Sequence, residues 1–405
     1  MNNLPGLRGA LTSSLLLATA LGCAPVDGDP VDDTDAVTLA LVNARTPSSN
    51  FSIVSIQVAG ASTFRTGVLI SNRMVLTSAR WVGWSTRPAD LTVQQTSTRG
   101  AVTTARGVRV NVHPNGLVAM IHLDAPLSIR GGTSGESQPL DLRTASQQHN
   151  LVVTCWAHTS PTAQGIVYQR VTATATATTV TQDAGNAQSL EDRDAGAVCL
   201  DVTHGGVLGM ATRTSAGVTT LVPMRDVADW FDDMRVLEGV IATARARATL
   251  PGALFVEQSP VAAPGTYHCL DVPNGHSVNN LPVNQFRCHW QPAQQWYLHD
   301  PEGDGIFSLV SASSGKCLDM AAGTAEGAAF QQFRCHFGAN QSFRASAWSQ
   351  GAGSRIVRAT APGLCLSATA RAGTLTDGVP VVQSACASGS STANTHQRWG
   401  WNERL

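Results

Sequence analysis

The chain has 405 residues, 43% of them hydrophobic, and its 27 basic and 28 acidic residues leave a formal net charge of −1. This length accommodates two or three domains, and the apolar content suffices for packed cores, which excludes global disorder. A charge so close to zero provides no basic surface for a polyanion, so no nucleic-acid partner is expected.

The N-terminal segment predicts an export signal. An apolar stretch follows Arg8 and is too short to span a bilayer as a helix. It ends in Ala20-Leu21-Gly22-Cys23, which resembles a bacterial lipobox and implies a signal peptide over 1–22 and acylation of Cys23. An ordinary secretory signal with an incidental cysteine is the alternative. Residues 23–36 are acidic and contain two prolines, which indicates a solvated tether.

The cysteine count agrees with export. The chain has nine cysteines, and eight remain if the one at position 23 is acylated, enough for four disulfides. An oxidising compartment favours such bonds. We therefore expect a protein of the bacterial cell envelope, lipid-anchored at the outer membrane, or a secreted one. The only membrane contact expected is the lipid anchor.

Residues 37–236 predict an all-β domain. Short apolar runs rich in β-branched residues, such as 53–58 and 108–112, alternate with clusters of Gly, Ser, Thr and Asn. This alternation alone leaves open whether the strands form a sandwich or a barrel.

A series of motifs in this region resembles the trypsin/chymotrypsin family of serine proteases. In chain order they are 66–70, 69–80, 117–123, 192–199, 206–222 and 227–231. The resemblance implies a chymotrypsin-like double β-barrel of two six-stranded halves.

The three positions of the family's catalytic triad carry other residues here. The position of the histidine holds Arg80, that of the aspartate holds Leu117, and that of the serine nucleophile holds Arg193. An arginine stays protonated and offers no hydroxyl, so it serves neither as a base nor as a nucleophile. The sequence therefore predicts a pseudoprotease. The alternative is a noncanonical active site rebuilt around His122, which we expect instead to form a surface pair with Asp124.

The family's disulfides are partly replaced. One bridge would join positions 65 and 81, which hold Arg65 and Trp81, so both cysteines are missing together. The resemblance implies that a second bridge, Cys155 with Cys199, is kept.

Residues 237–252 are rich in arginine and alanine, which favour a helix. We interpret them as a solvated linker between two domains.

The segment 253–405 contains a threefold repeat. Three copies of Cys-Leu open at Cys269, Cys317 and Cys365, each step being 48 residues (317 − 269 and 365 − 317). Each copy also has a second cysteine and closes on a glutamine, one residue and an aromatic residue. Three such units predict a closed arrangement, because one copy cannot bury its own apolar face. We expect the closing aromatics, Trp296, Phe343 and Trp399, to pack in the core.

The repeat resembles the ricin B-type lectin family, whose fold is a β-trefoil. The resemblance implies disulfides within each unit, although spacing alone allows other connectivities. The implied pairs are Cys269 with Cys288, Cys317 with Cys335, and Cys365 with Cys386.

The resemblance also implies which residues bind a saccharide through polar side chains and an aromatic ring. The middle unit has the complete set, namely Asp319, Gln331, Phe333, Asn340 and Gln341. The first unit forms a weaker second site from Asp271, Asn284, Phe286 and Gln294, because Ala293 replaces the asparagine. The third unit has Ser367, Val382 and Ser384 at these positions and is expected to be structural only.

The sequence as a whole predicts an all-β protein, a chymotrypsin-like double β-barrel followed by a β-trefoil. We expect a carbohydrate-binding protein with a non-catalytic trypsin-like domain, glycans or polysaccharides as partners, and neither a cofactor nor a metal. A protein partner of the protease-like domain is left open. The alternatives are a serine-type hydrolase directed to glycans by its lectin domain, and an inert surface scaffold. Galactose and xylan-type ligands are both compatible with the family.

Overall fold

The computed structural model describes residues 52–83, 86–97, 100–128, 140–182, 189–201, 206–256, 267–321, 325–345, 354–371, 374–387 and 396–403. The expected signal peptide (1–22), the lipidation candidate Cys23 and the expected tether (23–36) lie outside the described residues.

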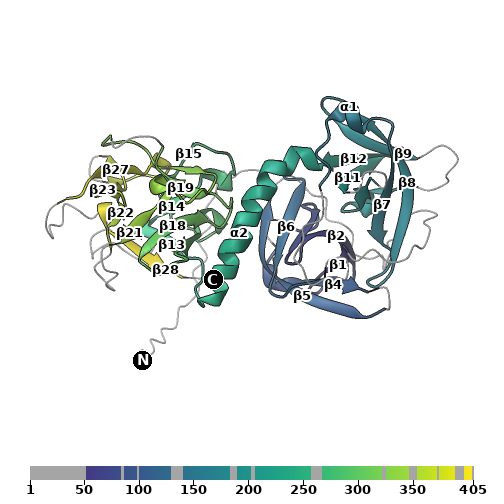
Figure 1. Cartoon of the computed structure of the whole chain (residues 1–405), viewed down its shortest axis with the longest axis horizontal. Coiled ribbons are helices and arrows are strands. Elements are labelled where there is room, and N and C mark those ends of the chain that lie inside the picture. Colours follow the sequence, from purple (N-terminus) through teal and green to yellow (C-terminus); the bar gives the residue numbers. More distant parts are fainter. Residues whose placement is uncertain are drawn as a thin grey trace, which may run out of the picture. The chain divides into compact units, whose positions relative to one another are not determined.

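The first barrel is a closed antiparallel sheet with the strand order β1-β2-β3-β6-β5-β4 (Figure 1). Its strands are β1 (Ile53–Val58), β2 (Phe64–Ser71), β3 (Met74–Ser78), β4 (Leu91–Thr96), β5 (Val102–Val112) and β6 (Val118–Leu123). A short 3-10 turn, η1 (Pro88–Asp90), precedes β4. Alternate residues of β3 and β6 enter two different cores, since Val75 and Ile121 fill the barrel while Met74 and Met120 pack outside it.

The second barrel closes in the order β10-β11-β12-β9-β8-β7. Its strands are β7 (Val152–His158), β8 (Gln164–Ala173), β9 (Thr178–Gln182), β10 (Val198–Leu200), β11 (Val207–Ser215) and β12 (Val218–Pro223). Three short helical turns accompany it, α1 (Ala145–Gln148), η2 (Asp192–Asp194) and η3 (Met224–Val227). Cys155 and Cys199 lie opposite each other on β7 and β10 and are joined by a disulfide.

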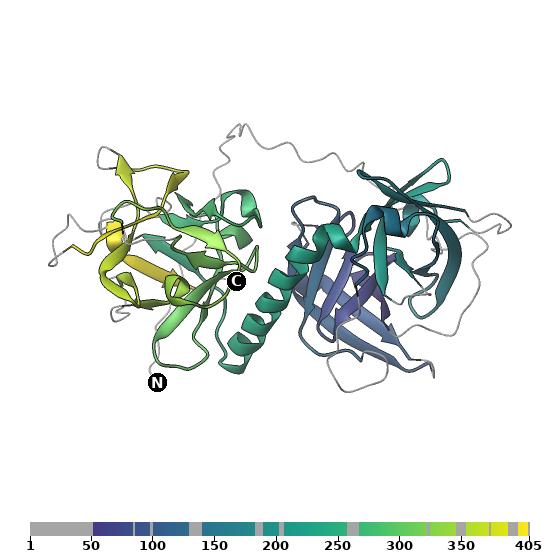
Figure 2. The same ribbon diagram turned by 45° about the horizontal axis from the view of Figure 1, so that its top comes forward.

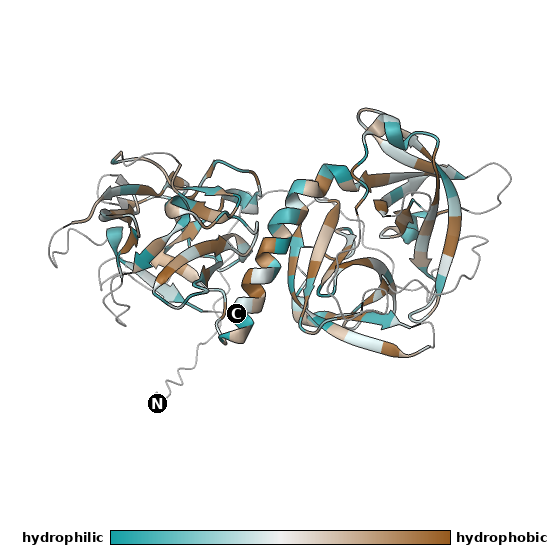
Figure 3. Ribbon diagram, viewed as in Figure 1, coloured by the Kyte–Doolittle hydropathy of each residue, from teal (hydrophilic) through white to brown (hydrophobic). Residues whose placement is uncertain are grey.

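The helix α2 (Ala228–Ala246) follows the second barrel and corrects one expectation. Residues 237–246 are not a solvated linker, because Leu237, Val240 and Ile241 are buried in a core that also contains residues of both barrels and of the repeat region. The physical reason is the spacing of the apolar residues, which forms one helical stripe. Figure 3 shows apolar and polar residues alternating along α2. All described residues belong to one compact unit.

The repeat region forms a β-trefoil of short antiparallel strands (Figure 2). Its strands are β13 (Ala253–Val256), β14 (His268–Asp271), β15 (Leu281–Pro282), β16 (Asn284–Arg287), β17 (Trp296–His299), β18 (Ile306–Ser311), β19 (Cys317–Asp319), β20 (Gln331–Phe333), β21 (Phe343–Ala345), β22 (Ile356–Arg358), β23 (Ala361–Ser367), β24 (Ala370–Arg371), β25 (Thr374–Leu375), β26 (Val379–Pro380), β27 (Val382–Ala385) and β28 (Trp399–Asn402). The 3-10 turns are η4 (Pro273–Gly275), η5 (Pro292–Gln294) and η6 (Ala339–Gln341).

The closing aromatics of the three repeats are core residues, as expected. Trp296, Phe343 and Trp399 are completely buried in one cluster. The indole N–H groups of the two tryptophans donate to the backbone carbonyls of Leu270 and Leu366, so these buried donors are satisfied. Within the described residues, each repeat also holds one disulfide that joins its own two cysteines. The predicted fold class, a chymotrypsin-like double β-barrel followed by a β-trefoil, is confirmed.

Candidate functional site

Arg80, predicted at the histidine position of the triad, forms an ion pair with a residue outside the predicted triad. Arg80 follows β3, and its Nη1 lies 2.6 Å from Oδ2 of Asp192, whose Oδ1 accepts the backbone N–H of Thr214 at 3.1 Å. Partial burial alone would raise the pKa of Asp192, but the Thr214 N–H and the Arg80 guanidinium together bring it below its usual value. A guanidinium held this way binds a carboxylate and takes no proton from a nucleophile.

The other two triad positions contribute no reactive group either. Arg193 lies in η2 and its Nη2 pairs with Oε2 of Glu191 at 2.5 Å. Leu117 precedes β6, its side chain is 43% exposed, and its backbone carbonyl accepts the N–H of Ala79. The structure therefore brings Arg80 to Asp192.

A stack of charged and aromatic side chains includes positions 65 and 81, for which the sequence predicts the loss of a disulfide. The guanidinium of Arg65 lies 4.0 Å from the ring centroid of Trp81, and that of Arg80 lies 4.9 Å from it. The indole N–H of Trp81 donates to the carbonyl of Ala195 at 3.0 Å. The ring of Trp81 thus makes a cation–π contact with each of two arginines.

Replacing Trp81 by alanine is expected to lower the free energy of unfolding by about 2–3 kcal/mol, because two cation–π contacts and a hydrogen bond are lost together. Trp81→Phe keeps the ring and should cost only about 1 kcal/mol. Denaturant unfolding of the three proteins measures both values. Equal stabilities of the two variants would show that the ring contributes nothing.

The pair expected between His122 and Asp124 is wrong. His122 is completely buried on β6, and its Nδ1 lies 2.7 Å from Oε2 of Glu238 on α2. Burial lowers the pKa of His122 despite the hydrogen bond and charge of Glu238. Asp124 instead accepts the backbone N–H of Arg106. The sequence could not reveal the pair, since Glu238 lies 116 residues further along the chain.

Asp319 is the centre of the candidate site in the middle repeat. Its buried carboxylate accepts hydrogen bonds from Gln331 Nε2 at 3.2 Å and from Asn340 Nδ2 at 2.8 Å. The register of β19 and β20 places Gln331 directly opposite Asp319, while η6 carries Asn340. Each amide is fixed by one of its donors, so its remaining polar groups face a ligand in a set direction.

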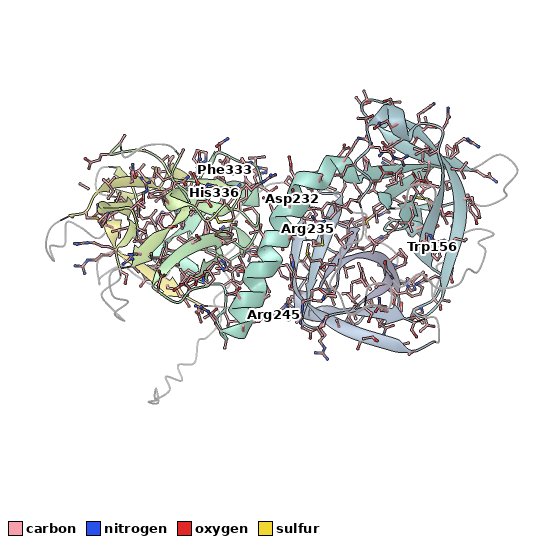
Figure 4. The ribbon with its side chains drawn as sticks, in the orientation of Figure 1. Trp156, Asp232, Arg235, Arg245, Phe333 and His336 are labelled. Atoms are coloured by element: carbon pink, nitrogen blue, oxygen red, sulfur yellow. A yellow bond between two sulfur atoms is a disulfide. The ribbon has the colours of Figure 1, made fainter. Side chains whose placement is uncertain are left out.

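An aromatic ring and an imidazole complete this site. Phe333 is half-buried, and its ring centroid lies 6.3 Å from that of the exposed His336 (Figure 4). The imidazole Nε2 lies 3.6 Å from Oδ2 of Asp319. A carboxylate, two amides, an imidazole and a partly exposed ring suit a pyranose, which has hydroxyl groups and an apolar face.

Gln341, which closes the middle repeat, is a core residue. Its amide is completely buried: Oε1 accepts the backbone N–H groups of His336 and Phe337, and Nε2 donates to Oδ2 of Asp319 and to the carbonyl of Arg334. All of these polar groups are engaged inside the protein.

Gln294 of the first repeat is buried in the same way. Its Oε1 accepts two backbone N–H groups, and its Nε2 donates to the carbonyl of Arg287. The burial of Gln294 and Gln341 disfavours direct contact with a sugar, and their role as ligand contacts stays a prediction. They hold the loop that follows the second cysteine.

The candidate site of the first repeat has the same arrangement as that of the middle repeat, with fewer side-chain hydrogen-bond donors around its aspartate. Asp271 lies opposite Asn284 in the register of β14 and β16, and His289 Nε2 lies 3.4 Å from its Oδ1. Phe286 is exposed beside His289, with ring centroids 6.0 Å apart. Ala293 offers no amide, and Oδ1 of Asp271 is buried without a hydrogen-bond partner among the described residues. An acceptor so poorly held is less well positioned for a ligand.

The third repeat has replaced its site by internal contacts. The hydroxyl groups of Ser367 and Ser384 bond to each other, and Val382 lies opposite Ser367. These side chains leave no carboxylate or amide for a sugar.

The sequence analysis missed the two histidines. His289 and His336 each follow directly on the second cysteine of their repeat, whereas Ala387 follows it in the third. The recurrence of histidine in the two repeats that keep an aspartate was the available signal.

Comparison with known proteins found one family model and several similar solved structures. Residues 261–333 match the family model described as Ricin-type beta-trefoil lectin domain-like. The designed threefold-symmetric protein ThreeFoil is 27% identical with a TM-score of 0.31, over 38% of this chain and 99% of that one. The inactivated protease paralogue S-D1 of the scabies mite is 14% identical with a TM-score of 0.38, over 47% and 95%. Human heparin binding protein is 18% identical with a TM-score of 0.39, over 47% and 93%. Comparison with curated proteins found no match.

The chain therefore carries a ricin-type β-trefoil lectin-like domain, which follows two closed six-stranded barrels. Its described helices include none long and apolar enough to cross a membrane. In the same ranges, no group of three His, Cys, Asp or Glu side chains is arranged to hold a metal ion.

Proposed function

We propose that this protein binds carbohydrate through the middle repeat of its trefoil, with Asp319, Gln331, Phe333, Asn340 and His336 as ligand contacts. The observation that carries the proposal is the buried Asp319 carboxylate with two fixed amides, an imidazole and a partly exposed ring around it. The first repeat, built on Asp271, serves as a weaker second site. A single shallow site of this kind binds with a Kd on the order of 0.1–1 mM.

The proposal includes a protease-like half that is not catalytic. The support is chemical: the positions of base and nucleophile hold arginines that pair with Asp192 and Glu191. A serine-directed covalent probe on the purified protein separates this from the hydrolase alternative. Labelling that disappears on replacement of a single double-barrel residue would establish the enzyme.

Export and anchoring complete the proposed function. Four disulfides among the described residues fit an oxidising compartment. An acylated Cys23 would concentrate many weak sites on a membrane and raise avidity.

Replacing Asp319 by alanine is expected to lower carbohydrate affinity at least about tenfold, because a charged acceptor is lost and the two amides it fixes are released. A glycan array compares the wild type, Asp319→Ala and the matched control Ser367→Ala from the third repeat. The control should retain all signals. An array on which the wild type binds nothing, or on which Asp319→Ala keeps every signal, would contradict the proposal and favour an inert scaffold.

A further inference from the structure

The strands β19 and β20, which carry residues of the middle-repeat site, are each flanked by a basic residue that forms an ion pair with α2. Just before β19, Lys316, which is the only lysine of the chain, donates from Nζ to Oδ2 of Asp233 at 2.6 Å. The side chains of Lys316 and Asp233 are 3% and 2% exposed. Just after β20, Arg334 donates from Nη2 to Oδ1 of Asp229 at 3.0 Å, and its Nε lies 4.0 Å from Oδ1 of Asp233.

Lys316 and Arg334 are near the site residues in the sequence, and hydrogen bonds connect Arg334 to Asp319 through Gln341. The backbone carbonyl of Arg334 accepts Nε2 of Gln341 at 3.0 Å, and the same Nε2 donates to Oδ2 of Asp319 at 2.9 Å. Arg334 also follows Phe333 directly, and the disulfide between Cys317 and Cys335 links the two strands. A short path of fixed bonds therefore runs from the carboxylates of α2 to Asp319.

Backbone packing brings α2 close at this point. A Cβ atom added to Gly315 would lie 2.5 Å from the backbone oxygen of Asp233, and Gly315 has a φ of +71°. The position thus has neither the room nor the conformation for a side chain. Figure 4 labels Phe333 and His336 on the trefoil and Asp232 on α2.

In the first repeat, the residues at the two equivalent positions pair with a carboxylate of the trefoil itself. Its residues before the two cysteines are His268 and Arg287, and both pair with Asp377 of the trefoil itself, at 3.1 and 3.6 Å. In the third repeat the equivalent residues are Leu364 and Ala385. Asp233 of α2 thus lies near the basic residues that precede the two cysteines of the middle repeat, and Asp377 pairs with those of the first repeat.

From this we infer that Asp233 is a positioning residue of the middle-repeat saccharide site, so that the site is complete only with the helix that ends the double barrel. The inference rests on the proposed function for its ligand and on the described contacts for its geometry. The inference assigns the protease-like half a structural role in saccharide binding that requires no catalysis. That half supplies the carboxylates against which β19 and β20 are fixed.

The test replaces both members of the Lys316–Asp233 ion pair, so that no unpaired charge is left buried. In the double variant Asp233→Leu/Lys316→Met, amide hydrogen exchange is expected to accelerate about tenfold or more in residues 331–343, while the matched segment 284–296 of the first repeat stays unchanged. The reverse is expected for the control Asp377→Asn. Affinity for a saccharide bound by the wild type should fall about 3- to 10-fold in the double variant. Arg334→Met should weaken binding in the same direction, and Arg334→Lys should restore it, with little change in melting temperature.

Unchanged exchange over 331–343 in a folded double variant would overturn the inference, as would equal acceleration in both repeats. If Arg334→Met is used because the double variant does not fold, unchanged exchange and affinity in that variant overturn it equally. Selective acceleration in a protein whose wild type binds no saccharide would support the positioning by α2 and count against the proposed function alone.

Discussion

Replacing Asp233 by leucine alone is expected to lower the free energy of unfolding by about 3–5 kcal/mol, because the ammonium group of Lys316 is then left buried without a counter-charge. The pair lies between α2 and the trefoil, and both side chains are almost completely inaccessible to solvent. Burial already raises the pKa of Asp233, against the opposing effect of Lys316. Desolvation of this carboxylate is therefore compensated mainly by its partner.

The double variant Asp233→Leu/Lys316→Met should recover most of that loss, since a well-packed apolar pair often replaces a buried ion pair at little cost. Denaturant unfolding of the wild type, both single variants and the double variant forms a double-mutant cycle. Single variants whose losses simply add in the double variant would show that the two charges do not interact.

Replacing Asp194 by asparagine is expected to stabilise the protein at pH 8 by about 3 kcal/mol, because burial raises the pKa of Asp194 to about 6 from its ordinary value of 3.8. Between these two values the unfolded chain loses its proton while the folded protein keeps it. The wild type therefore loses stability as the pH rises from about 4 to about 6. Asparagine carries no proton to lose and keeps an oxygen that accepts the N–H of Glu191.

The measurement is the difference in unfolding free energy between variant and wild type at several pH values from 4 to 8. It should be near zero at pH 4 and level off above pH 6. Asp192→Asn, in the same turn, is the control with the opposite sign. The lowered pKa of Asp192 means that its ion pair stabilises the protein at neutral pH and ceases to do so in acid. A difference for Asp194→Asn that does not vary with pH would show that this carboxyl ionises without penalty.

Some features of the fold and the site follow from the sequence because they depend on local order. The 48-residue step between Cys269, Cys317 and Cys365 requires three equivalent units, and the register of each unit then places position 319 opposite 331. The substitutions at Arg80 and Arg193 likewise remove an acid–base pair whatever surrounds them. Periodicity along the chain carries this kind of information.

Other features depend on what lies across the packed interior. Gln341 belongs to a motif that resembles a sugar ligand, yet four hydrogen bonds consume its amide. His122 has an acidic neighbour two residues away, yet the face of β6 that it occupies packs on α2 and pairs it with Glu238. Residues 237–246 were expected to form a solvated spacer, yet their apolar side chains are buried in a core that other parts of the chain complete.

The sequence by itself predicted that the catalytic residues of a protease are replaced and that the middle repeat has the complete set of candidate ligands. Only the tertiary structure decided which of those candidate side chains are buried and hydrogen-bonded inside the protein, and that Asp233, outside the repeat, is joined to their strands through Lys316. The physical reason is that residue type and spacing fix local geometry, whereas burial and the pairing of charges are set by segments that are distant in the chain.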